Sequence, residues 1–172
     1  LGNNHLTGSI PSEIGQLTNL QGLFLYDNEL TGIIPPEIGQ LTNLTVLRIY
    51  RNKLSGSIPS EIKNLKNLTE LQFSYNQLTG SIPIGIGQLT KLKTLGITSN
   101  KLTGNIPPEI GQLTNLTSFG CSVNALTGSI PPELGNLTGL TGFGCYQNQL
   151  TGWVLHSQGW GGSPGDAATA PS

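Results

Sequence analysis

Apolar residues recur in a fixed order along this chain, and the order repeats every 24 residues. In one unit, Leu44 is followed by Leu47 and Ile49, and the polar Asn52 comes three positions later. Side chains two positions apart point to the same face of an extended chain, so Leu47 and Ile49 predict a short strand with one buried face. The asparagine recurs without a slip at Asn4, Asn28, Asn52, Asn76, Asn100, Asn124 and Asn148. The pattern therefore predicts a stack of similar units with one strand each.

Two columns of apolar side chains follow from this stacking. The first contains Leu23, Leu47, Leu71, Leu95, Phe119 and Phe143, and the second contains Leu25, Ile49, Phe73, Ile97, Cys121 and Cys145. Parallel strands lie about 4.8 Å apart, so each column forms a continuous apolar ridge. The asparagine after each strand is expected to cap it, because its amide can both donate to and accept from a turning backbone. We expect this structural ladder at Asn28, Asn52, Asn76, Asn100, Asn124 and Asn148.

Glycine and proline hold fixed places in each unit. A glycine lies four residues after each asparagine, and a proline lies seven residues after each of the first six, as in Gly56 and Pro59. This phasing is turn chemistry, and the proline suits the start of a short helical turn. Five full repeats run from residue 20 to 139 with a partial repeat on each side, so residues 1–152 are predicted to form one solenoid. Residues 153–172, rich in Gly, Ser, Ala and Pro, are predicted to be a disordered tail.

The order x-L-T-G-x-I-P, as in residues 101–107, resembles the plant-type 24-residue leucine-rich repeat of receptor-like kinase ectodomains and polygalacturonase-inhibiting proteins. The resemblance implies an α/β solenoid, a leucine-rich-repeat superhelix with a short parallel β-sheet on the concave face and short helical turns on the convex side. The paired cysteines that usually flank such arrays are absent from this sequence, which also has no methionine. We therefore expect a fragment of a longer protein.

The same resemblance implies a non-catalytic recognition module, extracellular or at the cell surface, that binds a peptide or protein on its concave face. A co-receptor would be a further partner, and any kinase activity would lie outside this chain. The alternative is a solitary secreted protein that acts as a hydrolase inhibitor or binds ice. The ice-binding alternative rests on a ladder of hydroxyl side chains, Thr7, Thr31, Ser55, Thr79, Thr103, Thr127 and Thr151. These residues also belong to the ordinary L-T-G motif, which explains them without any ice contact.

The candidate ligand-binding residues are outward positions of the first three predicted strands and of the turns that follow them. They are Phe24, Tyr26, Arg48, Tyr50, Arg51, Gln72 and Tyr75. Exposed aromatic rings beside arginine have the composition of an interface hot spot, although scattered apolar residues also occur on ordinary surfaces. Six strands at about 4.8 Å span roughly 29 Å, which matches about eight extended residues of a peptide.

Charged neighbours in adjacent units sharpen the choice among these residues. Asp27 and Arg51 share one outward column, and Glu29 and Lys53 share the next, so we expect both to pair across the repeat boundary. Arg48 has no acidic residue in its own column. It is therefore expected to remain free for a carboxylate of the ligand.

Composition gives further expectations. Four N-x-T sequons, at Asn43, Asn67, Asn115 and Asn136, predict N-glycosylation of a secreted chain. The net charge of −1 gives no electrostatic reason to expect nucleic acid, and no apolar run reaches the roughly 18 residues of a membrane span. Both histidines lie near the chain ends and no Cys/His cluster has metal-ligand spacing, so we expect neither catalysis, nor a metal, nor a cofactor. Cys121 and Cys145 are expected to be free thiols.

Overall fold

The computed structural model describes residues 1–152, and the predicted disordered tail at 153–172 lies outside the described residues. Short strands and five-residue 3-10 helical turns alternate along the chain. The helical turns are η1 (Ser12–Gln16), η2 (Pro36–Gln40), η3 (Ser60–Asn64), η4 (Ile84–Gln88), η5 (Pro108–Gln112) and η6 (Pro132–Asn136). The main strands are β1 (Gly22–Phe24), β2 (Val46–Arg48), β3 (Glu70–Gln72), β4 (Thr94–Gly96), β6 (Ser118–Gly120) and β8 (Gly142–Gly144).

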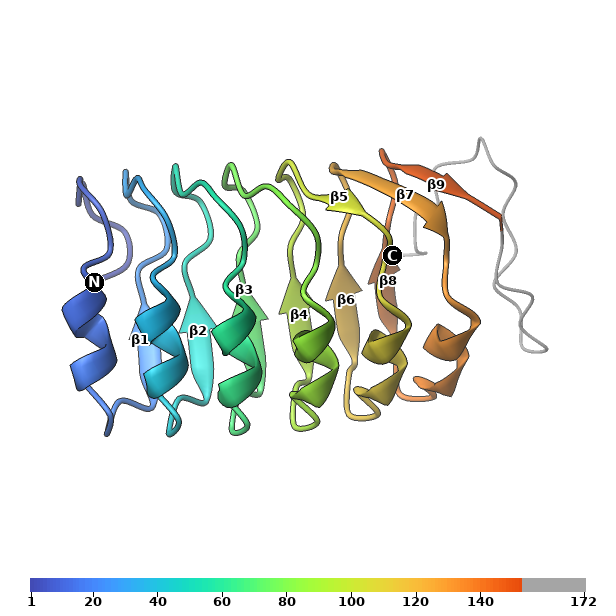
Figure 1. Ribbon diagram of the computed structural model, residues 1–172, viewed down its shortest axis with the longest axis horizontal. Coiled ribbons are helices and arrows are strands. Elements are labelled where there is room, and N and C mark those ends of the chain that lie inside the picture. Colours follow the sequence, from blue (N-terminus) through green and yellow to red (C-terminus); the bar gives the residue numbers. More distant parts are fainter. Residues whose placement is uncertain (153–172) are drawn as a thin grey trace.

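These six strands form one parallel sheet in the order β1-β2-β3-β4-β6-β8. Each residue pairs with the equivalent residue of the next repeat, as Leu47 does with Leu71. Figure 1 shows the consequence, a solenoid in which the strands form one row and the helical turns form another. The predicted fold class is confirmed, and the predicted short helical turns are 3-10 turns.

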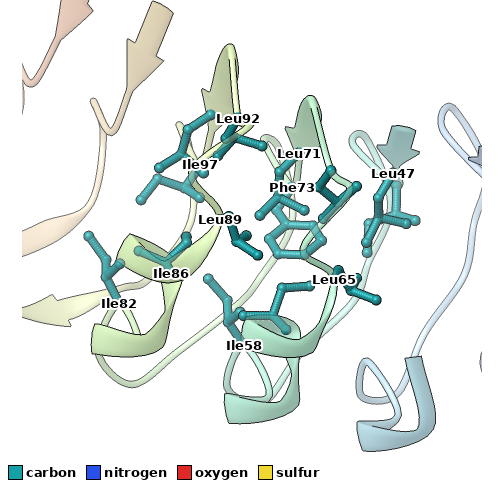
Figure 2. Close-up of a cluster of buried hydrophobic side chains, with 14 of the residues drawn as sticks. Leu47, Ile58, Leu65, Leu71, Phe73, Ile82, Ile86, Leu89, Leu92 and Ile97 are labelled. Atoms are coloured by element: carbon teal, nitrogen blue, oxygen red, sulfur yellow. The ribbon is translucent and has the colours of Figure 1, made fainter. Parts of the chain in front are cut away.

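The predicted apolar columns form the core between the two rows. Leu47, Leu71 and Phe73 are fully buried, and Figure 2 shows the Phe73 ring between the strands and the helical turns, near Leu65 and Leu89. The helical turns η2 to η6 each contribute one buried apolar side chain, such as Ile62, and most of the isoleucines in the L-T-G-x-I-P segments contribute another, such as Ile58. Burial decreases toward the C-terminal side, where Phe143 and Cys145 of the same columns are only partly buried.

The asparagine ladder is confirmed in atomic detail. The Nδ2 of Asn52 donates to the backbone carbonyls of Leu25 at 2.9 Å and Ile49 at 3.1 Å, while its Oδ1 accepts from the Leu30 N–H at 3.0 Å. One side chain thus joins its own strand to two segments of the preceding repeat. The residue before each ladder asparagine has positive φ, for example Arg51 at 52°. The chain turns inward at that left-handed residue, and the amide satisfies the backbone groups that the turn leaves unpaired.

A second, smaller parallel sheet was not predicted from the sequence. It contains β5 (Thr103–Gly104), β7 (Ala125–Ser129) and β9 (Gln149–Thr151), and isolated bridges such as Ser57 to Thr79 extend it toward the N-terminus. The L-T-G segments form it, although their glycines have φ near 74° as the turn prediction required, for example Gly80. Ordinary parallel hydrogen bonds continue on each side of that glycine, such as Thr79 N–H to the Gly56 carbonyl at 2.8 Å.

Candidate functional site

Four aromatic side chains gather on the outward face of β1–β3 and the turns that follow. We call Phe24, Tyr26, Tyr50 and Tyr75 the aromatic patch. The Tyr26 and Tyr50 rings stack with centroids 4.9 Å apart and planes at 7°. Phe24 and Tyr75 remain 39% and 52% exposed, respectively. The fold exposes these rings because outward positions of a strand alternate with the buried ones.

Arg48 is not free, so the expectation of an unpaired guanidinium was wrong. Its Nε and Nη2 each lie 2.7 Å from a carboxylate oxygen of Glu70. Glu70 pairs in register with Val46, two residues before Arg48, so the contact is diagonal between neighbouring strands. A long side chain reaches such a diagonal partner easily, whereas the sequence prediction considered acids in the same column only. The hydrogen bonds that Arg48 donates to the Glu70 carboxylate raise the pKa of Arg48 further.

Arg51 is the less satisfied of the two arginines. It pairs with Asp27 as predicted, but through a single contact of 3.4 Å, and its side chain is 61% exposed. Its guanidinium carbon lies 5.6 Å from the centroid of the Tyr75 ring, within the range of cation–π attraction. The other predicted pair, Lys53 with Glu29, is confirmed at 2.9 Å, and it lowers the pKa of Glu29 through the hydrogen bond from Lys53.

The predicted site residue Gln72 marks the border between two kinds of surface. Its side-chain oxygen occupies the space where a Cβ on Gly96 would stand. Beyond that point, the equivalent positions of β6 and β8 are Gly120 and Gly144, which are flanked by the hydroxyls of Thr98 and Ser122. The face therefore changes from aromatic and charged over β1–β3 to small and polar over β4, β6 and β8.

Three of the four sequon asparagines form an outer ladder that was not predicted from the sequence. The Nδ2 atoms of Asn43, Asn67 and Asn115 donate to the carbonyls of Thr18, Thr42 and Thr90 at 2.9, 3.0 and 2.8 Å. Their recurrence at one position of the repeat was the signal that could have revealed this structural role. Asn136 lies at the exposed end of η6. Whether any of the four carries a glycan remains a prediction.

Cys121 and Cys145 are free thiols that directly follow the neighbouring strands β6 and β8, as expected. Burial raises the pKa of both, which keeps them in the unreactive thiol form.

Within residues 1–152, no group of three or more His, Cys, Asp and Glu side chains is arranged to hold a metal ion. The helical turns of this part of the chain are too short and too polar to span a membrane.

Models of leucine-rich repeats match three stretches of the chain, namely residues 18–64 (leucine rich repeats, 2 copies), 42–102 and 115–137. The chain belongs to the leucine-rich-repeat family. A search of curated proteins finds no match. Among solved structures, the plant peptide hormone receptor RGFR1 in complex with RGF2 is 42% identical, with a TM-score of 0.85 over 87% of this chain.

Two further solved structures are similar. The ectodomain of the receptor kinase GASSHO1/SCHENGEN3 from Arabidopsis thaliana, in complex with CASPARIAN STRIP INTEGRITY FACTOR 2, is 41% identical with a TM-score of 0.86. A plant ice-binding protein is 34% identical with a TM-score of 0.80. Each match covers 87% of this leucine-rich-repeat chain, which spans 24% and 18% of the two receptors and 49% of the ice-binding protein.

Proposed function

We propose that this chain is a recognition module of an extracellular leucine-rich-repeat protein and binds a short extended peptide on its concave sheet face. The observation that carries the proposal is the aromatic patch. Exposed rings beside arginine are the residue types that dominate binding energy at protein interfaces. Solved receptors of 42% and 41% identity are described in complex with the named partners RGF2 and CASPARIAN STRIP INTEGRITY FACTOR 2, which supports a similar role here.

The peptide would contact the rings of Tyr50 and Tyr75 with apolar side chains. Arg51 would bind a carboxylate of this peptide, because its single contact of 3.4 Å with Asp27 leaves most of its N–H donors unused. Arg48 instead supports the site from within. Its pairing with Glu70 holds the guanidinium 5.6 Å from the Phe24 ring and so orders that edge of the aromatic patch.

The size of the face favours a peptide over a large protein. Six strands span roughly 29 Å, enough for about eight extended residues. A protein partner of ordinary size would bury about 800 Å² on each side and would extend onto further repeats or a co-receptor.

Selection from a display library of short random peptides tests the proposal. Peptides enriched on the wild-type chain should lose at least about tenfold in affinity with the double variant Tyr50→Ala/Tyr75→Ala, since truncating hot-spot residues typically costs 2 kcal/mol or more. Arg51→Ala should weaken only peptides that contain a carboxylate at the matching place.

Tyr146→Ala is the matched control. Tyr146 occupies the same column as Tyr26 and Tyr50 and is 48% exposed, but it lies beyond β8 at the other side of the face. Equal losses with Tyr146→Ala and with the double variant would contradict the assignment of the patch. The same variants would also locate the contact surface of a hydrolase inhibitor.

Ice binding is a second candidate, because one observation favours it. The second sheet presents a row of exposed hydroxyls in which Ser57 pairs with Thr79 and Ser81 with Thr103. The exposed Ile33 interrupts this row. A solved plant ice-binding protein is 34% identical to this chain.

Inhibition of ice recrystallisation distinguishes this candidate. An ice-binding chain should lose the activity with Thr103→Tyr, which places a bulky ring on the hydroxyl row. It should keep the activity with Thr94→Tyr, a matched change at an outward position of β4. Activity lost equally with both variants, or absent from the wild-type chain, would eliminate ice binding through this row.

A further inference from the structure

Four lysines cluster at one edge of the solenoid, away from the proposed peptide site. We call Lys63, Lys66, Lys91 and Lys93 the lysine edge. They lie at the end of η3 and in the loops that join η3 to β3 and η4 to β4, along the lower border of the molecule in Figure 1. All four side chains are exposed, and together they are half of the eight lysines and arginines of the chain.

Comparison with the other repeats shows that each lysine replaces an uncharged residue. Lys63 stands where Gly15, Gly39, Gly87, Gly111 and Gly135 occur, and Lys66 stands where Thr18, Thr42, Thr90, Thr114 and Thr138 occur. Lys91 stands in the column of Asn19, Asn43, Asn67 and Asn115, and Lys93 stands in the column of Thr45, Thr69, Thr117 and Thr141. Four substitutions of one charge type therefore coincide at a single boundary between two repeats.

The packing at this boundary has changed to accept them. Elsewhere a glycine at the end of one helical turn lies under the glutamate of the next, as Gly39 lies against Glu61. Between η3 and η4 the large and small residues are exchanged. Lys63 stands in the place of the glycine, and it packs over Gly85, which stands in the place of the glutamate. The first turn of η4 consequently has no acidic residue, whereas each of the other five helical turns has a glutamate there.

The ammonium groups are oriented but not neutralised. Lys66 Nζ donates to Gln88 Oε1 at 2.7 Å and Lys91 Nζ donates to Asn67 Oδ1 at 2.8 Å, and both bonds cross the repeat boundary in opposite directions. The ion pairs among residues 1–152 are Arg48–Glu70, Arg51–Asp27 and Lys53–Glu29, so none includes the lysine edge. The nearest acid on η3, Glu61, instead accepts a hydrogen bond from Ser60 at 3.1 Å.

We propose that the lysine edge binds a linear anionic polysaccharide that carries a carboxylate or sulfate on its sugar units. Lysine ammoniums are point charges on flexible stems, which suit anions of variable spacing. The amides of Gln88 and Asn67 and the hydroxyls of neighbouring threonines can hydrogen-bond sugar hydroxyls. A protein partner is less well matched, since interface cores are depleted in lysine and enriched in aromatic residues.

Binding to polygalacturonate and to dextran sulfate, with uncharged dextran as the reference, tests this site. The full chain should be produced without glycosylation, so that the sequon Asn67 stays unmodified, and titrated by calorimetry at about 0.02 M and about 0.3 M salt. We expect binding to either polyanion at low salt only, because exposed charges are screened within about 10 Å at 0.1 M salt. Lys66→Gln/Lys91→Gln should weaken it roughly tenfold, as expected for two exposed charge contacts.

Lys53→Gln/Lys101→Gln is the matched control, because it removes the same charge from the opposite edge and should change the affinity by less than about twofold. Equal weakening by both pairs would overturn the site in favour of a net-charge effect, as would a wild-type chain that binds neither polyanion. Tighter, equally lysine-dependent binding of polyglutamate would overturn the choice of a polysaccharide. Thermal melting confirms that both double variants are folded.

Discussion

The two halves of the concave face have the same backbone and different surfaces. Over β1–β3 the outward positions hold Phe24, Tyr26 and Tyr50, whereas over β4, β6 and β8 the position equivalent to Phe24 is glycine, as in Gly120. The strand register does not change between the halves, as the pairs Leu47–Leu71 and Leu95–Phe119 show. The fold is therefore specified by the inward columns and the asparagine ladder, and the outward residues are free to differ.

The halves also differ inside. Phe73 and Cys121 occupy the same buried column, one under the aromatic patch and the other under the glycine-rich half. A large side chain fills the space between strand and helical turns in the N-terminal half (Figure 2). The C-terminal half has instead a small thiol at this position, with a stacked pair of rings, Phe119 and Phe143, in the adjacent column.

The largest expected effect separates these two interiors. Phe73→Ala should destabilise the chain by about 3–5 kcal/mol, because it leaves a cavity in a close-packed core. Cys121→Ala in the same column should cost only about 1 kcal/mol, since little volume is removed. Urea unfolding followed by circular dichroism measures both, and hydrogen exchange shows whether each loss stays within neighbouring repeats. Similar losses for the two variants would mean that the halves are equally packed.

The asparagine ladder should act alike in both halves. Asn76→Ala and Asn124→Ala each leave three or more backbone groups without their amide partner. We expect each to cost about 1–3 kcal/mol, with the two values within about 0.5 kcal/mol of each other. Unfolding of the two single variants measures this directly. A much smaller loss at Asn124 would show that the scaffold itself, and not only its surface, differs between the halves.

The strands, the buried columns and the asparagine ladder could be predicted from the sequence because the same pattern recurs in every repeat. Leu47, Ile49 and Asn52 each recur at one spacing, so the buried columns and the ladder followed from periodicity alone. The pairing of Arg48 with Glu70 did not follow, because it is a diagonal contact set by side-chain reach. The second sheet was missed since a positive-φ glycine such as Gly80 reads as a turn, although the backbone on either side continues a parallel ladder.

Alkaline pH should weaken the C-terminal half selectively. Burial raises the pKa of Cys121 and Cys145 above the value of a thiol in the unfolded chain, about 8.5. Below that pH the thiols are protonated in both states, so the free energy of unfolding is at its full value. As pH rises above it, the free energy of unfolding falls, because only the unfolded state ionises. Near pH 9.5 the loss from a buried thiol is about 1 kcal/mol. Hydrogen exchange should show β6 and β8 losing protection before β2 and β3, and Cys121→Ala/Cys145→Ala should remove the difference.

The smallest expected change in the free energy of unfolding comes from removing the acidic partners of the two arginines, Arg48 and Arg51. Glu70→Gln breaks a two-bond pair with Arg48, whose members are 38% and 23% exposed, and should cost about 0.5–1 kcal/mol after allowance for solvent screening. Asp27→Asn removes only the 3.4 Å contact with the more exposed Arg51 and should cost close to zero. Chemical unfolding at low and high salt measures both, and only the Glu70→Gln loss should shrink with salt.

The reverse order would restore Arg48 as the free guanidinium and reassign the ligand carboxylate to it. The expected order leaves Arg48 as part of the scaffold beneath Phe24. In that case Arg51 is the arginine of the aromatic half that stays available, beside the exposed ring of Tyr75. A peptide that binds there needs one carboxylate close to an apolar side chain, whereas the glycine-rich half imposes no charge requirement. The two halves of the concave face would then contact different parts of the same peptide.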